Sequence, residues 1–179
     1  YDNKGRRFTA TVFHTSVSDQ IVGIKGADGK SYQTNAASYR NTGVEISYAQ
    51  DVDAHFSFNT GVTYGNPERK YKAGQDWVRA LGRYQMTAGV NYENRDLTAA
   101  VSLSYWGDRG YNSTRSERTS FVPISGNLLV SNLHVAYRFT PALMGTFDVD
   151  NLLNRRDYTN SGTYYTVRRS FLVGVNYVF

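Results

Sequence analysis

The stretch Phe171-Leu172-Val173-Gly174-Val175-Asn176-Tyr177-Val178-Phe179 closes the chain and decides its fold. Successive side chains of a strand point to opposite faces. One face of this stretch is therefore entirely apolar, and it consists of Phe171, Val173, Val175, Tyr177 and Phe179. At the end of a soluble domain such a face would favour aggregation. In a membrane-spanning barrel strand it is required, because one face meets hydrocarbon and the other meets the lumen.

The same alternation recurs upstream and predicts seven more strands. The eight expected strands are Arg6–Ser16, Tyr39–Ala49, Ala54–Tyr64, Leu81–Tyr92, Leu97–Tyr105, Leu129–Phe139, Ala142–Asp150 and Phe171–Phe179. One face of each is rich in Phe, Tyr, Val, Leu, Ile and Ala, and the other is mostly small and polar. Most reach about 9–11 residues, which is the length a tilted strand needs to cross a bilayer.

The connections between these strands alternate in length. Three are tight turns, near residues 50–53, 94–96 and 140–141, whereas the long ones cover 18–38, 65–79, 107–126 and 154–167. Short turns at one end and long loops at the other are typical of an outer-membrane barrel. A soluble β-sandwich is the alternative for any alternating sequence, but it predicts strands of about 5–6 residues. We therefore expect an all-β fold of antiparallel transmembrane barrel strands.

Composition excludes several other classes. No run approaches the roughly 20 apolar residues that a spanning helix needs, and the mean hydropathy is −0.51. The 15 Tyr, 9 Phe and 2 Trp suit the aromatic girdles of a membrane barrel. With no Cys, the chain offers neither disulfides nor thiolate metal ligands. Its net charge of +5 comes with interspersed acidic residues and no recognisable binding motif, so no nucleic acid partner is expected.

The most distinctive segment of the chain is Val149-Asp150-Asn151-Leu152-Leu153-Asn154-Arg155-Arg156-Asp157-Tyr158, followed by 164–171 and the terminal strand. This segment resembles the barrel of TonB-dependent outer-membrane receptors. The family pattern there is approximately V-x-N-L-F-D-x-x-Y, and this chain departs from it at Leu153 and Asn154. It also has Val167-Arg168 where Pro-Gly is common. Weaker matches cover 8–21 and 40–45.

The resemblance implies that the chain is incomplete. Such receptors have a 22-stranded barrel around an N-terminal plug, so residues 1–179 would be a C-terminal barrel segment of eight strands without the plug domain. The chain begins Tyr1-Asp2-Asn3-Lys4-Gly5, without a start Met or a signal peptide, and we expect a mature protein or part of a longer one. A free-standing eight-stranded barrel is the rival, although the small polar side chains would pack its narrow interior poorly.

The resemblance also implies a location and partners. It places the chain in the cell outer membrane of a Gram-negative bacterium, in contact with membrane lipid and lipopolysaccharide. The apolar residues of the terminal stretch resemble the signal read by the barrel-assembly machinery. The cargo would be a scarce nutrient, most often an iron chelate such as a ferric siderophore. TonB would be contacted only through the missing N-terminal part.

The long connections carry the candidate ligand-binding residues. Basic and aromatic side chains interleave there, and together they can hold an anionic, ring-bearing ligand by charge and stacking. The candidates are Arg69, Lys70, Tyr71, Lys72, Trp77, Trp106, Arg109, Tyr111, Arg115, Arg118, Arg155, Arg156, Tyr158, Tyr164 and Tyr165. Two other roles remain open: neutralising lipopolysaccharide phosphates, and forming the interfacial aromatic girdle.

His134 and Asp148 suggest a less favoured alternative, a barrel-embedded hydrolase. Both lie on the polar face and should be nearly opposite across a hairpin, with Asp150 two residues further on. A His with carboxylates suits general acid–base chemistry, but no Ser nucleophile can be placed beside them. A hydrogen-bonded pair in the barrel wall is the simpler interpretation.

We expect that this chain is not an enzyme and that it has neither a catalytic residue nor a cofactor. The three His residues, 14, 55 and 134, have no regular ligand spacing, so no metal site is expected either.

Overall fold

The computed structural model describes residues 2–3, 5–25, 29–71, 74–115, 118–124, 126–157 and 165–179, and only strands and connections occur in them. Eleven strands form one antiparallel sheet with the main order β1-β2-β3-β4-β7-β8-β11-β12-β13. A second sheet contains β9 (Gly110–Arg115) and β10 (Arg118–Pro123). No helix in the described part of the chain is long and apolar enough to span a membrane.

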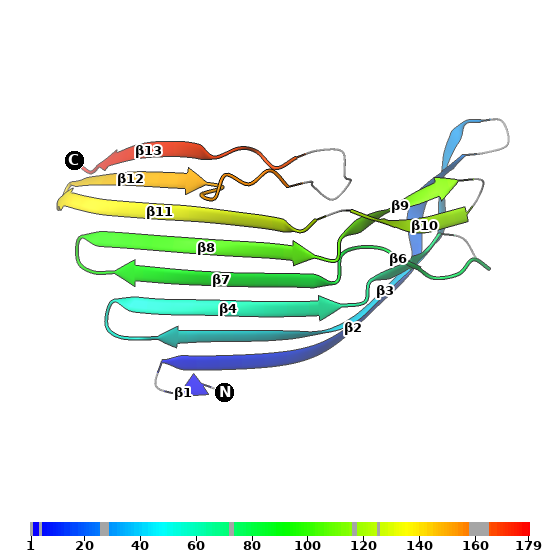
Figure 1. Cartoon of the computed structure of the whole chain (residues 1–179), viewed down its shortest axis with the longest axis horizontal. Coiled ribbons are helices and arrows are strands. Elements are labelled where there is room, and N and C mark those ends of the chain that lie inside the picture. Colours follow the sequence, from blue (N-terminus) through cyan, green and yellow to red (C-terminus); the bar gives the residue numbers. More distant parts are fainter. Residues whose placement is uncertain are drawn as a thin grey trace.

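The main sheet is built from eight long strands joined mostly as hairpins (Figure 1). They are β2 (Arg6–Lys25), β3 (Ser31–Asp51), β4 (Phe56–Gly65), β7 (Tyr84–Glu93), β8 (Leu97–Gly107), β11 (Leu128–Thr140), β12 (Leu143–Asp150) and β13 (Ser170–Tyr177). Each expected strand overlaps one of them, which confirms the all-β antiparallel fold. Figure 1 shows the short turns and both chain ends on one side, and the longer connections on the other.

The predicted boundaries were wrong for the first two strands. β2 and β3 continue far past the expected ends and pair up to Lys25↔Ser31, so the expected loop 18–38 is mostly a hairpin. Along this extension the apolar alternation disappears, although backbone pairing continues. The pattern depends on a face that meets hydrocarbon, and it ends where that demand ends.

Short strands also occupy two other expected loops, so the predicted number of strands was too low. β5 (Glu68–Lys70) pairs with both β3 and β6 (Val78–Arg79), and the β9–β10 hairpin fills much of 107–126. Near the N-terminus, β1 (Asp2–Asn3) pairs with β2. The terminal strand ends at Tyr177, not Phe179, although the Val178 N–H still donates to the Ala142 carbonyl at 3.0 Å.

Each of the three short turns is held by one side-chain oxygen that accepts two backbone N–H groups. Asp53 Oδ1 accepts from His55 and Phe56 at 2.7 and 2.8 Å. Asn94 Oδ1 accepts from Asp96 and Leu97, and Thr140 Oγ1 from Ala142 and Leu143. Asx and Ser/Thr turns of this kind satisfy donors that a tight reversal would otherwise leave unpaired. The two hydrogen bonds also lower the pKa of Asp53 below its usual value.

The large apolar side chains point out of the sheet rather than into a sealed core. Val12 is 82% exposed and Val173 is 72% exposed, and the buried hydrophobic residues among those described are Ala37, Ala80 and Val149. A sandwich would bury such side chains between two facing sheets. A single sheet with an exposed apolar face is instead what a lipid-facing wall requires.

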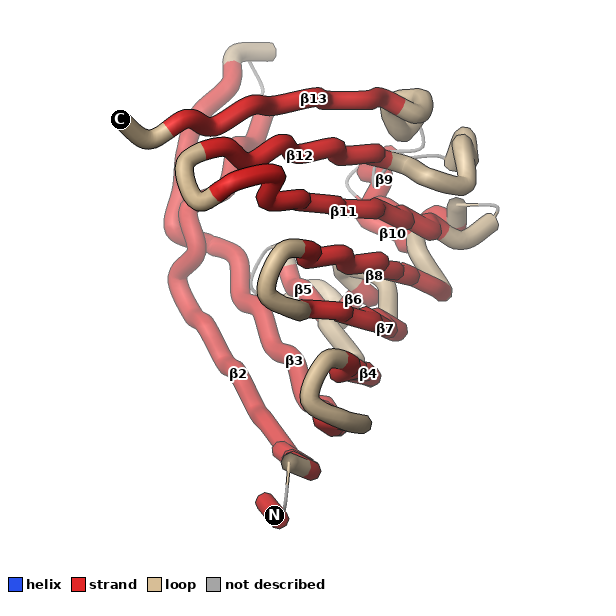
Figure 2. The backbone as a smooth tube through the Cα atoms, turned by 90° about the vertical axis from the view of Figure 1, so that its left-hand side faces the viewer, coloured by secondary structure: helices blue, strands red, loops and turns tan. Residues whose placement is uncertain are grey.

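The sheet curves but does not close on itself (Figure 2). In the described residues, β13 pairs only with β12, and no ladder joins it to β1 or β2. This open arrangement differs from the closed cylinder that a free-standing eight-stranded barrel needs.

Candidate ligand-binding site at the long-connection end

A cavity of about 300 Å³ lies on the polar face of the sheet, where the long connections begin. Strands β2, β3, β4, β7 and β8 contribute to its wall. Its aromatic and polar lining includes Phe13, Tyr39, Asn41, Gln85 and Trp106, and two guanidinium groups, of Arg83 and Arg109, add positive charge. This combination can attract an anion and stack on a ring.

Asp108 binds two arginines, of which Arg83 lines the cavity. Arg79 holds it with a two-pronged contact, Nη1 to Oδ2 and Nη2 to Oδ1, each at 2.9 Å. Arg83 Nη1 lies 3.9 Å from Asp108 Oδ2, and the Arg79 guanidinium stacks 3.7 Å over the ring of Phe121. One carboxylate thus serves two arginines, and the site keeps a net positive charge.

Arg109 is the most deeply buried cation of the site, at 4% exposure. Burial lowers the pKa of its guanidinium, and the nearby charge of Asp157 acts in the opposite direction. Arginine stays charged even so, because its ordinary pKa is far above neutral. The third and fourth long connections are therefore coupled electrostatically through Arg109 and Asp157.

A second depression, of about 330 Å³, continues from the cavity along the polar face. Thr63 and Gln85 line both. The second depression is lined mainly by hydroxyl groups from Thr9, Thr11, Ser47 and Thr87, with Glu45 as its one described carboxylate. A polar track thus leads from the basic cavity towards the short-turn end.

Pairing of β5 with β3 sends the candidate residues of the second connection to opposite faces. Arg69 is opposite Tyr39, on the cavity side, whereas Lys70 is opposite Ser38 and shares the other face with Arg40. Arg69 lies 5.8 Å from the ring centre of Tyr71, whose hydroxyl accepts a hydrogen bond from Asn112 at 3.0 Å. On the other face, Arg40 and Lys70 both lie over the Trp77 ring, at 4.3 and 5.4 Å from its centre.

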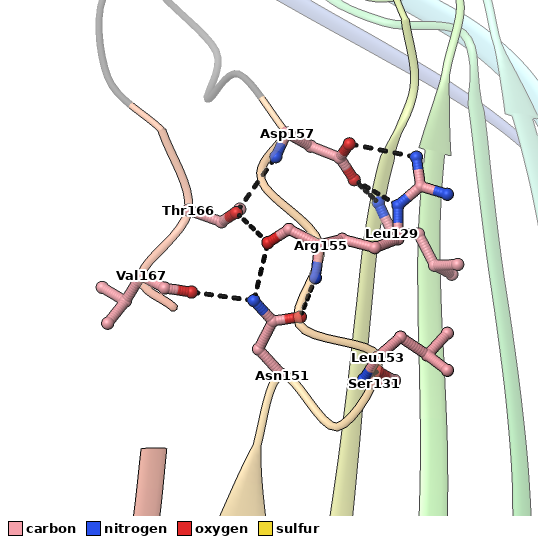
Figure 3. Close-up of polar contacts among 8 residues, drawn as sticks. All are labelled: Leu129, Ser131, Asn151, Leu153, Arg155, Asp157, Thr166 and Val167. Carbon is pink, nitrogen blue, oxygen red and sulfur yellow. Dashed lines mark hydrogen bonds and ion pairs between the residues drawn. The ribbon is translucent and has the colours of Figure 1, made fainter. Parts of the chain in front are cut away.

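The fourth connection is fixed at its start by Asn151 (Figure 3). Its Nδ2 donates to the carbonyls of Arg155 and Val167, both at 2.8 Å, and its Oδ1 accepts from the Arg155 N–H at 3.0 Å. Asn151 is 7% exposed and has a φ of 51°, a conformation that Asn tolerates better than most residues. Asn151 thus stabilises the strand-to-loop transition, whereas the neighbouring Asp150 accepts one bond from Ser170.

Asp157 ties this connection to β11. Its Oδ2 accepts from the Leu129 N–H at 3.0 Å and from Arg155 Nε at 2.9 Å, while Oδ1 accepts from Arg155 Nη2 at 3.0 Å (Figure 3). The hydrogen bonds from Arg155 lower the pKa of this carboxyl group, and the Leu129 N–H and the charge of Arg109 act in the same direction, against its partial burial. The guanidinium of Arg155, one of the ligand candidates, is therefore occupied by a structural contact.

The remaining candidates are distributed as follows. Trp106 and Arg109 line the cavity, Arg156 stacks 4.1 Å over Tyr165, and Tyr111 is exposed on β9. Arg115 and Arg118 pair through their backbones in the β9–β10 hairpin, and their side chains are not described. Lys72, Tyr158 and Tyr164 lie outside the described residues. Whether any candidate binds a ligand stays a prediction.

Sequence reasoning missed Tyr39 and Arg83, which line the cavity, and also Arg79, Asn112 and Phe121, which make contacts within the long connections. Arg79 is the last residue of the basic second connection and Arg83 follows it four residues later, so the candidate set could have been extended to both. Tyr39 was assigned to a spanning strand, and Phe121 gave no signal without the β9–β10 pairing.

His134 and Asp148 face each other as expected. They are direct partners in the β11–β12 ladder, and His134 Nδ1 lies 2.6 Å from Asp148 Oδ1. In the described part of the chain no hydroxyl nucleophile is hydrogen-bonded to His134, and the pair forms part of the wall. No cluster of three or more His, Cys, Asp or Glu residues suitable for a metal occurs among the residues described.

Comparison with known families identifies the class of this sheet. Residues 1–152 match the family model described as TonB dependent receptor-like, beta-barrel. The chain belongs to this family, whose members are transport receptors of the Gram-negative outer membrane rather than enzymes. That assignment places the chain in the outer membrane, with the polar face towards the lumen. A comparison with curated protein sequences gave no match.

Solved structures share the fold at low sequence identity. The copper transporter OprC is 19% identical with a TM-score of 0.74, and the G324V mutant of the ferric enterobactin receptor PfeA from Pseudomonas aeruginosa is 18% identical with a TM-score of 0.76. Both alignments cover 100% of this chain and 30% of the other. The FrpB iron transporter from Neisseria meningitidis (F3-3 variant) is 16% identical over 99% of this chain and 30% of its own, with a TM-score of 0.74. This chain thus spans about 30% of the length of these structures.

Proposed function

We propose that this chain is the C-terminal wall and part of the extracellular loops of a 22-stranded receptor that imports a ferric siderophore or a similar iron chelate. The observation that carries the proposal is the cavity on the lumenal face, where Arg83 and Arg109 lie beside Trp106 and Tyr39. Chelates with anionic, ring-bearing iron ligands match that combination of charge and stacking surface.

The proposed whole protein would need parts that these residues do not supply. A plug would block the lumen, and TonB would act on the receptor through the N-terminal part. The barrel-assembly machinery would read the terminal stretch, with Phe171, Val173, Val175, Tyr177 and Phe179 as its apolar face. The open edges of the sheet support membership of a larger barrel, because unpaired strand edges in lipid cost several kcal/mol for each unsatisfied group.

Uptake measurements on the complete receptor test the proposal. In iron-starved cells that lack other iron-chelate receptors, the wild type should import a radiolabelled ferric catecholate only when TonB is present. Trp106→Ala and Arg83→Gln should each weaken chelate binding about tenfold, as expected for loss of a stacking or a charge-assisted contact.

Arg95→Ala is the matched control, because it removes a cation from a short turn at the opposite end of the sheet. Binding and uptake should then stay near the wild-type values. Failure of the wild type to bind any ferric chelate would contradict the proposed cargo. Unchanged binding in both cavity variants would remove the cavity from the binding site.

A further inference from the structure

The register of β3 and β5 places a group of basic and aromatic side chains on the lipid-facing side, above the membrane. Arg40 is separated from Val44 and Ile46 by even numbers of residues along β3, so it lies on the same face as these apolar residues. Lys70 joins that face through its pairing with Ser38, and both cations lie over the Trp77 ring. We call Arg40, Lys70 and Trp77 the outward basic cluster.

The aromatic boundary of the membrane gives the height of the outward basic cluster. Val44 is level with Tyr64 and Tyr84, whose rings pack at 5.2 Å on the lipid-facing side. Tyr side chains of this kind gather at the edge of the hydrocarbon. Arg40 is four residues further along β3, which is about 13 Å along the strand and about 10 Å along the membrane normal at an ordinary tilt. That height is the level of lipid head groups.

Local contacts orient the Arg40 side chain and leave N–H donors of the cluster available to an anion. Glu68 Oε2 binds Arg40 Nε at 2.7 Å, and the guanidinium lies 4.3 Å from the centre of the Trp77 ring. Among the described residues, neither the terminal nitrogens of Arg40 nor Lys70 Nζ has a hydrogen-bond partner. The Arg40 side chain is 43% exposed. With two cations against one carboxylate, the cluster carries a net positive charge and several unused N–H donors.

We propose that the outward basic cluster docks the phosphate-bearing head group of the outer-leaflet lipid, which is lipid A of lipopolysaccharide. Arg40 and Lys70 donate charge-assisted hydrogen bonds to one phosphate. Trp77 packs against the adjoining sugar and acyl region, as amphipathic rings do at membrane interfaces. The proposal depends on the outer-membrane location and not on the identity of the cargo.

Arg69 supplies a matched control within the same strand. It is the immediate neighbour of Lys70 but points to the cavity side, opposite Tyr39. The complete receptor, purified in detergent without its native lipid, is titrated with bisphosphorylated lipid A and with the dephosphorylated lipid, using native mass spectrometry. We expect Arg40→Gln/Lys70→Gln to weaken binding of the phosphorylated lipid about tenfold. Arg69→Gln should leave lipid binding within about twofold of the wild type.

Several results would overturn the proposed docking of lipid A. If the double variant binds bisphosphorylated lipid A like the wild type, or if Arg69→Gln weakens lipid binding equally, the proposal fails. Should the double variant not fold, the wild type still decides, because equal affinity for the phosphorylated and dephosphorylated lipids would overturn it. Displacement of the lipid by inorganic phosphate would indicate a free-anion site and would also overturn the lipid assignment.

Discussion

Asn151 combines two properties that are rarely needed in one residue. Its backbone adopts a φ of 51°, and its side-chain amide donates to the carbonyls of Arg155 and Val167, which lie in the outgoing and returning halves of the connection that follows β12. Gly would satisfy the first requirement without the second. A residue with a Cβ and no amide would satisfy neither.

Substitution of Asn151 separates these two contributions. Asn151→Gly keeps the backbone conformation and loses three hydrogen bonds, so we expect local opening of the fourth connection to become easier by about 2–3 kcal/mol. Asn151→Ala should add about 1 kcal/mol of backbone strain. Amide hydrogen exchange over 152–157 and 165–169 in the complete receptor measures both values. Equal protection in the wild type and Asn151→Gly would show that the amide contacts contribute nothing.

The lowered pKa of Asp157 predicts that the stability of the same connection depends on pH. Its folded pKa lies below the ordinary value, so its contribution to stability is complete above about pH 4. That contribution is lost as the pH falls through the lowered folded pKa. Exchange of the Leu129 amide should therefore be constant from neutral pH down to about 4, after correction for the intrinsic rate, and accelerate below. In Asp157→Asn, exchange should already be faster at neutral pH. An acid-insensitive Leu129 amide would contradict the role of this carboxylate.

At the residue scale, the sequence predicted positions better than contacts. The opposition of His134 and Asp148 follows from counting residues on either side of a short turn, and it was confirmed at 2.6 Å. The pairing of Arg155 with Asp157 was missed, because a count of cations in a loop does not show which ones carboxylates already occupy.

At the scale of elements, the hydrophobic alternation predicted the membrane-crossing portions and little beyond them. It located all eight long strands, because lipid imposes an apolar residue at every second position. The β2–β3 extension has no such constraint, and only its backbone ladder defines it. The consecutive residues Arg69 and Lys70 were grouped as one loop site, but once β5 is recognised as a strand they must point to opposite faces.

Gly43 marks a close approach between strands that alternation alone does not reveal. A methyl group there would collide with the carbonyl oxygen of Tyr64 and lie 2.5 Å from Cζ of Phe13. We expect Gly43→Ala to destabilise the β2–β3–β4 region by about 1–3 kcal/mol, as overpacking does. The urea midpoint for unfolding of the complete receptor should fall accordingly.

Gly23→Ala on the neighbouring strand β2 is the control. A Cβ at that position meets nothing within 4 Å. Its urea midpoint should match the wild type or rise slightly, because Ala restricts the unfolded chain more than Gly does. A similar loss in both variants would mean that the close approach at Gly43 is not the cause.

For the whole molecule, the division of the sheet into two faces explains most of its features. The apolar face is exposed and the polar face carries the connected cavities, an arrangement that is stable only between lipid and an aqueous lumen. The chain spans about 30% of the length of the similar solved structures, and within the part that the structure describes both edges of the main sheet are open. Cargo selection in the proposed receptor would therefore depend partly on residues outside this chain.

Neighbouring residues of β4 provide the most direct test of this division. By strand alternation Val62 belongs to the apolar face, and it is 41% exposed although it also borders the second depression. Thr63 belongs to the polar face and lines both cavities. Because this chain has no cysteine, Val62→Cys and Thr63→Cys each introduce a single nitroxide attachment site within it. In the complete receptor in bilayers, the label at position 62 should be relaxed strongly by dissolved oxygen and weakly by a water-soluble nickel complex. The label at 63 should lack this oxygen preference. A label at 62 shielded from oxygen, or one at 63 with the signature of a lipid-exposed site, would contradict the account.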